Sequence, residues 1–260
     1  MTNSEHLSDT LSKVPAITLG FWIIKVLATT LGETAGDTVS MTMNLGYLVG
    51  TAIFAGLLVL LVWLQMRART FHPSLYWTTI IASTTAGTTM ADYATRSLGI
   101  GYTGGSTLLL GCVALSLLVW HRTLGTISVD TVSSAKSELF YWVTITFSQT
   151  LGTALGDWAA DTGGLGYLGG ATLFSIGLAA LLALYYTTRT SGVLLFWTAF
   201  ILTRPLGATV GDFLDKPLAK GGLDFSRPLA SLVLAVAIAV LIVVLPQYAG
   251  SHPKRDTKVT

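Results

Sequence analysis

Long apolar stretches alternate with short polar segments along the whole chain, a pattern typical of a protein with several membrane-spanning helices. A helix of about 20 residues crosses the hydrocarbon core of a bilayer, and the chain has room for eight. We predict helices over residues 16–39, 45–66, 74–96, 101–120, 138–160, 166–187, 193–214 and 228–246. The even-numbered helices of this series are mostly apolar, whereas the odd-numbered ones contain acids, hydroxyls and glycines.

An internal repeat underlies this pattern. An aromatic–Trp pair lies near the start of each odd-numbered helix. Ten residues after the Trp lies a glycine, fifteen residues after it an aspartate preceded by a small residue, and twenty-four residues after it a second glycine. The four series are Trp22, Gly32, Asp37, Gly46; Trp77, Gly87, Asp92, Gly101; Trp142, Gly152, Asp157, Gly166; and Trp197, Gly207, Asp212, Gly221. Such gapless recurrence indicates four copies of one helical hairpin.

The spacing of the repeats predicts the architecture. Successive Trp residues are 55, 65 and 55 residues apart, which relates the first two repeats to the last two as duplicated halves. Because each repeat has two helices, all four repeats cross the membrane in the same direction. We therefore expect an all-α integral membrane protein of about eight transmembrane helices, arranged as four parallel helical-hairpin repeats with pseudo-twofold halves.

Basic residues predict the orientation, because cytoplasmic segments of membrane proteins are rich in Lys and Arg. Nine lie in the terminal segments and after even-numbered helices, against four after odd-numbered helices, so both termini are expected in the cytoplasm. We predict a cytoplasmic tail (1–15), a first half (16–120), a cytoplasmic linker (121–137), a second half (138–246) and a second cytoplasmic tail (247–260). The four Trp residues would form an aromatic belt at the inner face, toward which Lys25 would extend.

Composition excludes several classes of protein. Of the 260 residues 52% are hydrophobic and 11% charged, whereas a soluble domain has about 25% charged residues. With a mean hydropathy of +0.66, this excludes an ordinary cytosolic enzyme, a disordered protein and a nucleic-acid binder. The single cysteine, Cys112, excludes an internal disulfide, and the histidines fall in tails and connections, which disfavours a zinc or copper site.

Acidic residues gather at the far end of the odd-numbered helices. Carboxylates inside a span are costly unless they are paired or hydrated, and they face the bundle interior or a water-filled cavity. Their oxygen atoms suit hard cations such as Mg2+, Ca2+ or Mn2+, Na+ or protons. We predict a metal-binding acidic layer made of Glu33, Asp37, Asp92, Asp157, Asp161 and Asp212. In the alternative interpretation, each aspartate only caps the end of its helix at the water interface.

Basic residues near this layer predict which acids are compensated. Arg96 and Lys216 lie four residues after Asp92 and Asp212, on the same helical face. Repeats one and three have no basic residue at that place, so we expect their acids to be uncompensated and to hold the cation.

Arg204 lies in mid-span before Pro205, which should kink the helix, and a buried arginine needs an anionic partner. We expect Arg204 to be a charge-compensating group that competes for the acidic site as a tethered cation. Nearby hydroxyl and amide groups either solvate an ion path or join helices, and the glycines are candidates for close packing. These polar residues are Thr29, Thr30, Thr84, Thr85, Thr88, Ser148, Gln149, Thr150 and Thr153.

The fourfold series of aromatic–Trp, Gly and Gly-Asp resembles a bacterial family of multi-pass membrane proteins built of four tandem repeats of unknown function. The resemblance covers residues 16–246 and implies the bacterial inner (cytoplasmic) membrane, but no activity. In addition, the segment GETAGDT at residues 32–38 is similar to the Glu-x-Gly-Asp-Lys/Arg-Thr/Ser motif of divalent-cation exporters. It has one extra residue and lacks the basic position. This second similarity favours Mn2+ or Ca2+ as the ion.

These observations predict a secondary transporter of a small cation, above all a divalent metal exchanged for protons. A cation channel would have the same acidic layer and is the first alternative. The second is a non-transport membrane protein or an enzyme that acts on a hydrophobic molecule, although no Gly-x-Ser-x-Gly motif or intramembrane histidine dyad points to an enzyme. The expected partners are the lipid bilayer and a small cation, with no cofactor and no nucleic acid.

Overall fold

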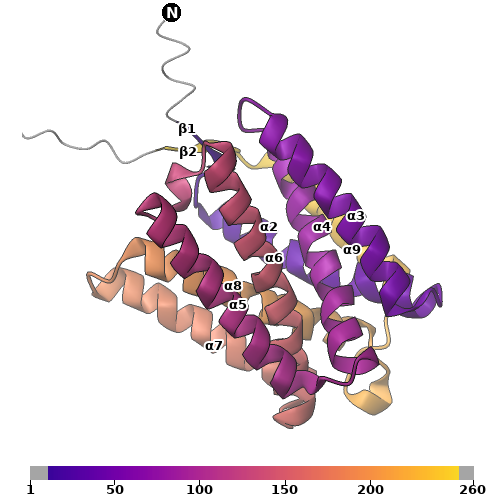
Figure 1. Ribbon diagram of the computed structural model, residues 1–260. Helices are drawn as coiled ribbons and strands as arrows, with labels where there is room; N and C mark the ends of the chain where they lie inside the picture. Colours follow the sequence, from indigo (N-terminus) through magenta and orange to yellow (C-terminus); the bar gives the residue numbers. More distant parts are fainter. Residues whose placement is uncertain (1–10, 252–260) are drawn as a thin grey trace, which may run out of the picture.

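The computed structural model describes residues 11–251 of the chain, and over this part it contains eight long helices in four hairpins (Figure 1). The helices are α2 (Leu19–Asp37), α3 (Gly46–Arg67), α4 (Pro73–Asp92), α5 (Gly101–Leu124), α6 (Ala135–Asp157), α7 (Gly166–Thr187), α8 (Gly192–Asp215) and α9 (Arg227–Val244). Their bounds agree with the predicted ones to within a few residues. The predicted all-helical class and the four hairpin repeats are thereby confirmed.

The turns inside the hairpins follow from the second glycine of the repeat. Gly46, Gly101 and Gly166 begin α3, α5 and α7 with φ angles of 77°, 71° and 66°, a conformation that glycine adopts without strain. Before each of these turns the preceding helix continues into one π-helical turn, which the sequence did not reveal. The π-helical segments are Thr38–Thr42, Tyr93–Ser97 and Trp158–Thr162.

The helices form two concentric rings. The inner ring consists of α2, α4, α6 and α8, which pack against one another in that cyclic order, with α8 returning to α2. The outer helices α3, α5, α7 and α9 each cover the inner helix of the next repeat, so that α9 packs on α2 and closes the circle. The four repeats are therefore related by a pseudo-fourfold axis through the inner ring.

The first glycine of each repeat allows the inner helices to approach closely. At all four places an added Cβ would overlap the neighbouring inner helix, so the predicted role in close packing is confirmed. The residue that fills the space lies seven positions after the Trp of its own repeat. The contacts join Gly32 to Thr84, Gly87 to Gln149, Gly152 to Arg204 and Gly207 to Thr29.

Polar side chains lie inside this assembly and apolar side chains outside. Over the described residues, α3, α5, α7, α8 and α9 are long and apolar enough to cross a membrane, and the four outer helices expose large apolar side chains along their length. The more polar helices α2, α4 and α6 are mostly buried in the inner ring. Because this distribution is the reverse of that in soluble proteins, the chain is a multi-pass membrane protein.

The two ends of the described chain meet at one end of the bundle. There β1 (Leu11–Pro15) pairs with β2 (Ala249–Ser251) in an antiparallel two-stranded sheet (Figure 1). An even number of spanning helices places both ends on the same side of the membrane, and which side that is stays a prediction. Residues 11–15 and 249–251 are thus strands and not simple tails, and the remainder of the predicted tails, 1–10 and 252–260, lies outside the described residues.

The predicted aromatic belt is wrong. Trp77, Trp142 and Trp197 are at most 3% exposed, and Trp22 is half-buried. At the end that carries the sheet, each packs against an aromatic ring of a neighbouring inner helix. The indole N–H of Trp77 donates to Gln247 at 3.1 Å and that of Trp197 to the carbonyl oxygen of Ile127 at 2.9 Å. These aromatic side chains face the neighbouring inner helices. A Trp that recurs in a sequence repeat can face either protein or lipid, so the repeat alone could not predict this.

Candidate functional site: a buried charge network

Five layers of side chains are stacked along the axis of the inner ring. The repeated positions are four residues apart, slightly more than one helical turn, so each lies nearly above the one before it on its helix. Every member is buried. From the sheet end, the layers are Phe21, Tyr76, Tyr141 and Phe196; Lys25, Ile80, Ile145 and Phe200; Thr29, Thr84, Gln149 and Arg204; Glu33, Thr88, Thr153 and Ala208; and Asp37, Asp92, Asp157 and Asp212.

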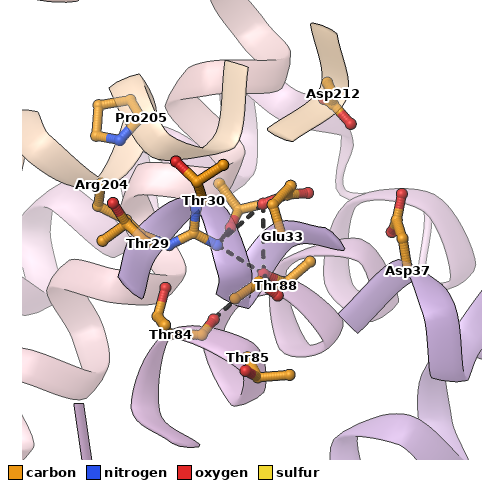
Figure 2. A network of polar contacts seen from close by, with 12 residues as sticks. Thr29, Thr30, Glu33, Asp37, Thr84, Thr85, Thr88, Arg204, Pro205 and Asp212 are labelled. Carbon is orange, nitrogen blue, oxygen red and sulfur yellow. Dashed lines mark hydrogen bonds and ion pairs between the residues drawn. The ribbon is translucent and has the colours of Figure 1, made fainter. Parts of the chain in front are cut away.

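Arg204 joins all four inner helices through one nitrogen atom. Its Nη2 donates to Oε2 of Glu33 at 3.0 Å, to Oγ1 of Thr88 at 2.6 Å and to Oγ1 of Thr153. Figure 2 shows the guanidinium group directed from α8 toward Glu33 and Thr88. Helix α8 continues through Pro205. The expectation that Arg204 has an anionic partner in the bundle is confirmed by this ion pair.

Lys216 joins the aspartates of repeats four and one. Its Nζ lies 2.9 Å from Oδ1 of Asp212 and 2.5 Å from Oδ2 of Asp37. Burial opposes the charge on Lys216, but these two carboxylates outweigh it and raise the pKa of Lys216 above its usual value. The group is therefore an ammonium ion at neutral pH. Arg227 adds a second cation at 3.2 Å from Asp215.

Arg96 makes the corresponding link between repeats two and three. Its Nε lies 3.0 Å from Oδ1 of Asp92, and its Nη2 lies 3.2 Å from Oδ2 of Asp157. The predicted pairing of each cation with the aspartate four residues earlier is confirmed. The expectation that the acids of repeats one and three are uncompensated is wrong, because the ring places each cation beside the next repeat as well.

The predicted acidic residues fall into separate groups. Glu33, Asp37 and Asp212 each offer one carboxylate oxygen, and these atoms lie within 4.8 Å of one another (Figure 2). Asp92 and Asp157 are held together by Arg96. Asp161, in contrast, is exposed and joins neither group, since it lies on the π-helical turn beyond the end of α6.

The capping interpretation does not explain the aspartates. Asp37, Asp92 and Asp157 make no side-chain hydrogen bond to the start of the π-helical turn that follows them. Their carboxylates contact cations instead. One of the two acidic groups, Glu33 with Asp37 and Asp212, has three carboxylate oxygens close enough for a single ion.

Two contributions were missed or misjudged from the sequence. Asp215 was missed, and it is 4% exposed and bound to Arg227. Lys25 was expected to extend to the interface but is 0% exposed, with its Nζ 4.1 Å from the centroid of the Phe200 ring. The available signal was the repeat itself, because Lys25 occupies the place of Ile80 and Ile145, which are inward apolar positions.

The chain was also compared with known proteins. A family model described as Repeat of Unknown Function (DUF347) matches it four times, over residues 20–71, 75–126, 140–191 and 195–247. Each match covers one hairpin, so the repeat identified from the sequence is confirmed. No curated protein and no solved structure shows significant similarity to the chain.

Proposed function

Because the chain belongs to this family of repeats, whose description names no activity, we propose a function from the buried charge network: secondary transport of a small cation. The cation is a divalent metal such as Mn2+, Ca2+ or Mg2+, exchanged for protons along the axis of the inner ring. The observation that carries this proposal is the approach of Glu33, Asp37 and Asp212 to within 4.8 Å inside the bundle. Sites with only oxygen donors suit these hard cations.

In the ion-free state of the proposed site, two side-chain cations are paired with its three carboxylates. Lys216 holds Asp37 and Asp212, and Arg204 holds Glu33. Removing one partner of a buried ion pair costs about 3–5 kcal/mol, so the carboxylates need positive charge whether or not an ion is bound. A divalent ion would displace Lys216 from Asp37 and Asp212. When the ion leaves, Lys216 returns, and one proton on the three carboxylates supplies the remaining positive charge. The carboxylates are thus neutralised alternately by the metal ion and by protons with Lys216, as exchange of one for the other requires.

The sheet end of the axis favours a transporter over an open channel. The aromatic layer there is buried, and the hydroxyl groups of Tyr76 and Tyr141 are hydrogen-bonded at 2.6 Å. The next layer packs Ile80, Ile145 and Phe200 together. An ion can leave at this end only if these layers separate, so each passage requires a conformational change.

The test begins with ion binding to the purified protein in detergent. A ligand that binds only the folded state raises the unfolding temperature in a saturable way. We expect such a rise with one of Mn2+, Ca2+ or Mg2+, its loss in Asp37→Asn, and its retention in Asp161→Asn, which removes an exposed aspartate from the π-helical turn of repeat three. Absence of a rise with every cation, or an unchanged rise in Asp37→Asn, would contradict the proposed site.

Transport itself is then measured in liposomes that contain a pH-sensitive dye. Uptake of the bound cation should drive protons outward, and the proton flux should disappear in Asp37→Asn. Cation uptake without any proton movement would identify the channel alternative.

A further inference from the structure

Lys25 is a buried charge that the proposed cation pathway does not use. It is 0% exposed, and its Nζ makes no hydrogen bond to any residue of the described chain. Its layer otherwise contains Ile80, Ile145 and Phe200, which offer no side-chain acceptor. Contact with the Phe200 ring offsets only part of the cost of burying an uncompensated charge. An ammonium group at this place needs a counter-ion or a solvating group that residues 11–251 do not supply.

The adjacent layer contains further donors that lack acceptors within residues 11–251. Arg204 uses only Nη2 for Glu33, while its Nε and Nη1 are buried without hydrogen bonds. Both amide atoms of Gln149 and the hydroxyl of Thr84 are also buried and unpartnered. In a membrane interior each unsatisfied group of this kind is costly. The layer therefore has a surplus of donors over acceptors.

Packing brings these donors to the same region of the axis. Lys25 lies on the ring of Phe200, one turn before Arg204 on α8. Arg204 lies against Gly152 of α6, which is three residues after Gln149. The three polar side chains thus come from α2, α6 and α8, and occupy two successive layers.

The charges of these layers do not cancel. Among the described residues between the aromatic layer and the aspartate layer, the axial charges are Lys25, Arg204 and Glu33. The sum over these three side chains is one positive charge. Water could satisfy the donors, whereas a small anion would both satisfy the donors and balance the charge. The surrounding side chains are buried, so such an anion would be enclosed by protein.

We propose that Lys25, Arg204 and Gln149 form a binding site for a small inorganic monovalent anion, such as chloride. The anion lies on the axis between the Lys25 layer and the Arg204 layer, where Lys25 and Arg204 supply opposite charge and Gln149 and Thr84 supply neutral donors. This goes beyond the proposed cation transport, because it requires neither the acidic group nor any movement of ions across the membrane.

The test compares unfolding temperatures in chloride, nitrate and acetate with those in gluconate, at constant ionic strength and with one cation throughout. We expect a saturable rise with chloride or nitrate and none with gluconate, which is too large for the site. In Lys25→Met, which keeps the length of the side chain without its charge, the rise should disappear. Lys136→Met, which removes an exposed lysine, should keep it.

In a second variant, the carboxylate of a side chain takes the place of the bound anion. Gln149→Glu places a carboxylate beside Lys25 and Arg204, and it should raise the unfolding temperature in gluconate while abolishing the chloride response. An equal response to chloride in wild type and Lys25→Met, or a wild type that responds equally to all anions, would overturn the proposal and leave Lys25 as a neutral amine. Because the cation panel is run in gluconate salts, failure of this inference is distinguishable from failure of the proposed transport.

Discussion

Arg204 makes contacts that distribute one positive charge over all four inner helices. Arg204→Met removes this charge and leaves Glu33 buried without its cation. We expect the free energy of unfolding to fall by about 3–5 kcal/mol, the usual cost of breaking a buried ion pair. The double variant Glu33→Gln with Arg204→Met has neither charge of this pair left to bury, and it should recover most of that loss.

Denaturant unfolding of the wild type, the two single variants and the double variant in one detergent completes a double-mutant cycle. If the double variant were as unstable as the sum of the single ones, the two residues would act independently and the ion pair would have no energetic role.

The sequence predicted the charge contacts that lie within one helix and missed those between helices. Asp92 with Arg96 and Asp212 with Lys216 follow from a spacing of four residues. The contacts of Arg96 with Asp157 and of Lys216 with Asp37 join residues 61 and 179 positions apart. Which repeats are neighbours decides these contacts, and no local spacing contains that information.

Between elements, the contact of α4 with α6 depends on Gly87. A Cβ at this position would lie 2.8 Å from the backbone of Gln149, and a helix backbone cannot move aside as a flexible side chain can. Gly87→Ala should therefore cost about 1–3 kcal/mol, as overpacking does. Gly111→Ala on α5 is the matched control, because its Cβ would meet open space, and alanine should gain up to about 1 kcal/mol from helix propensity.

Thermal unfolding of both variants in the same detergent measures the difference. Equal stability of Gly87→Ala and wild type would show that the inner ring is loosely packed at this level, contrary to the close approach of the helices.

The elements themselves were largely predictable, because four copies of one pattern fix each helix better than a single copy could. Which side of each helix faces the interior of the bundle could not be predicted from the sequence. Trp142 and Lys25 stand at positions where an interface anchor and a snorkelling side chain are the ordinary interpretation. Both point inward because their positions on α2 and α6 face the neighbouring inner helices, and that neighbourhood depends on how the repeats close into a ring.

The whole molecule is a closed ring in which the order of the repeats matters more than the place where the chain starts. Helix α9 of repeat four packs on α2 of repeat one in the way that α3 packs on α4. Leu11 and Ser251 are paired in the sheet, so the ends of the described chain already adjoin. Every repeat also begins on the same side of the membrane, because each contains two spanning helices.

A circular permutant should therefore fold. We consider a chain that is opened between Arg189 and Thr190, in the exposed connection from α7 to α8, with residues 251 and 11 joined by a short Gly/Ser linker. Its order is repeat four, one, two, three, which preserves every neighbour in the ring, and exposed connections are the sites at which permutation succeeds. We expect a monodisperse protein with the wild-type response to cations, measured by size-exclusion chromatography and thermal unfolding. A control opened inside α4 breaks one inner helix and should not fold. If both permutants aggregated, the order in which the repeats are synthesised, and not only their closed arrangement, would determine the fold.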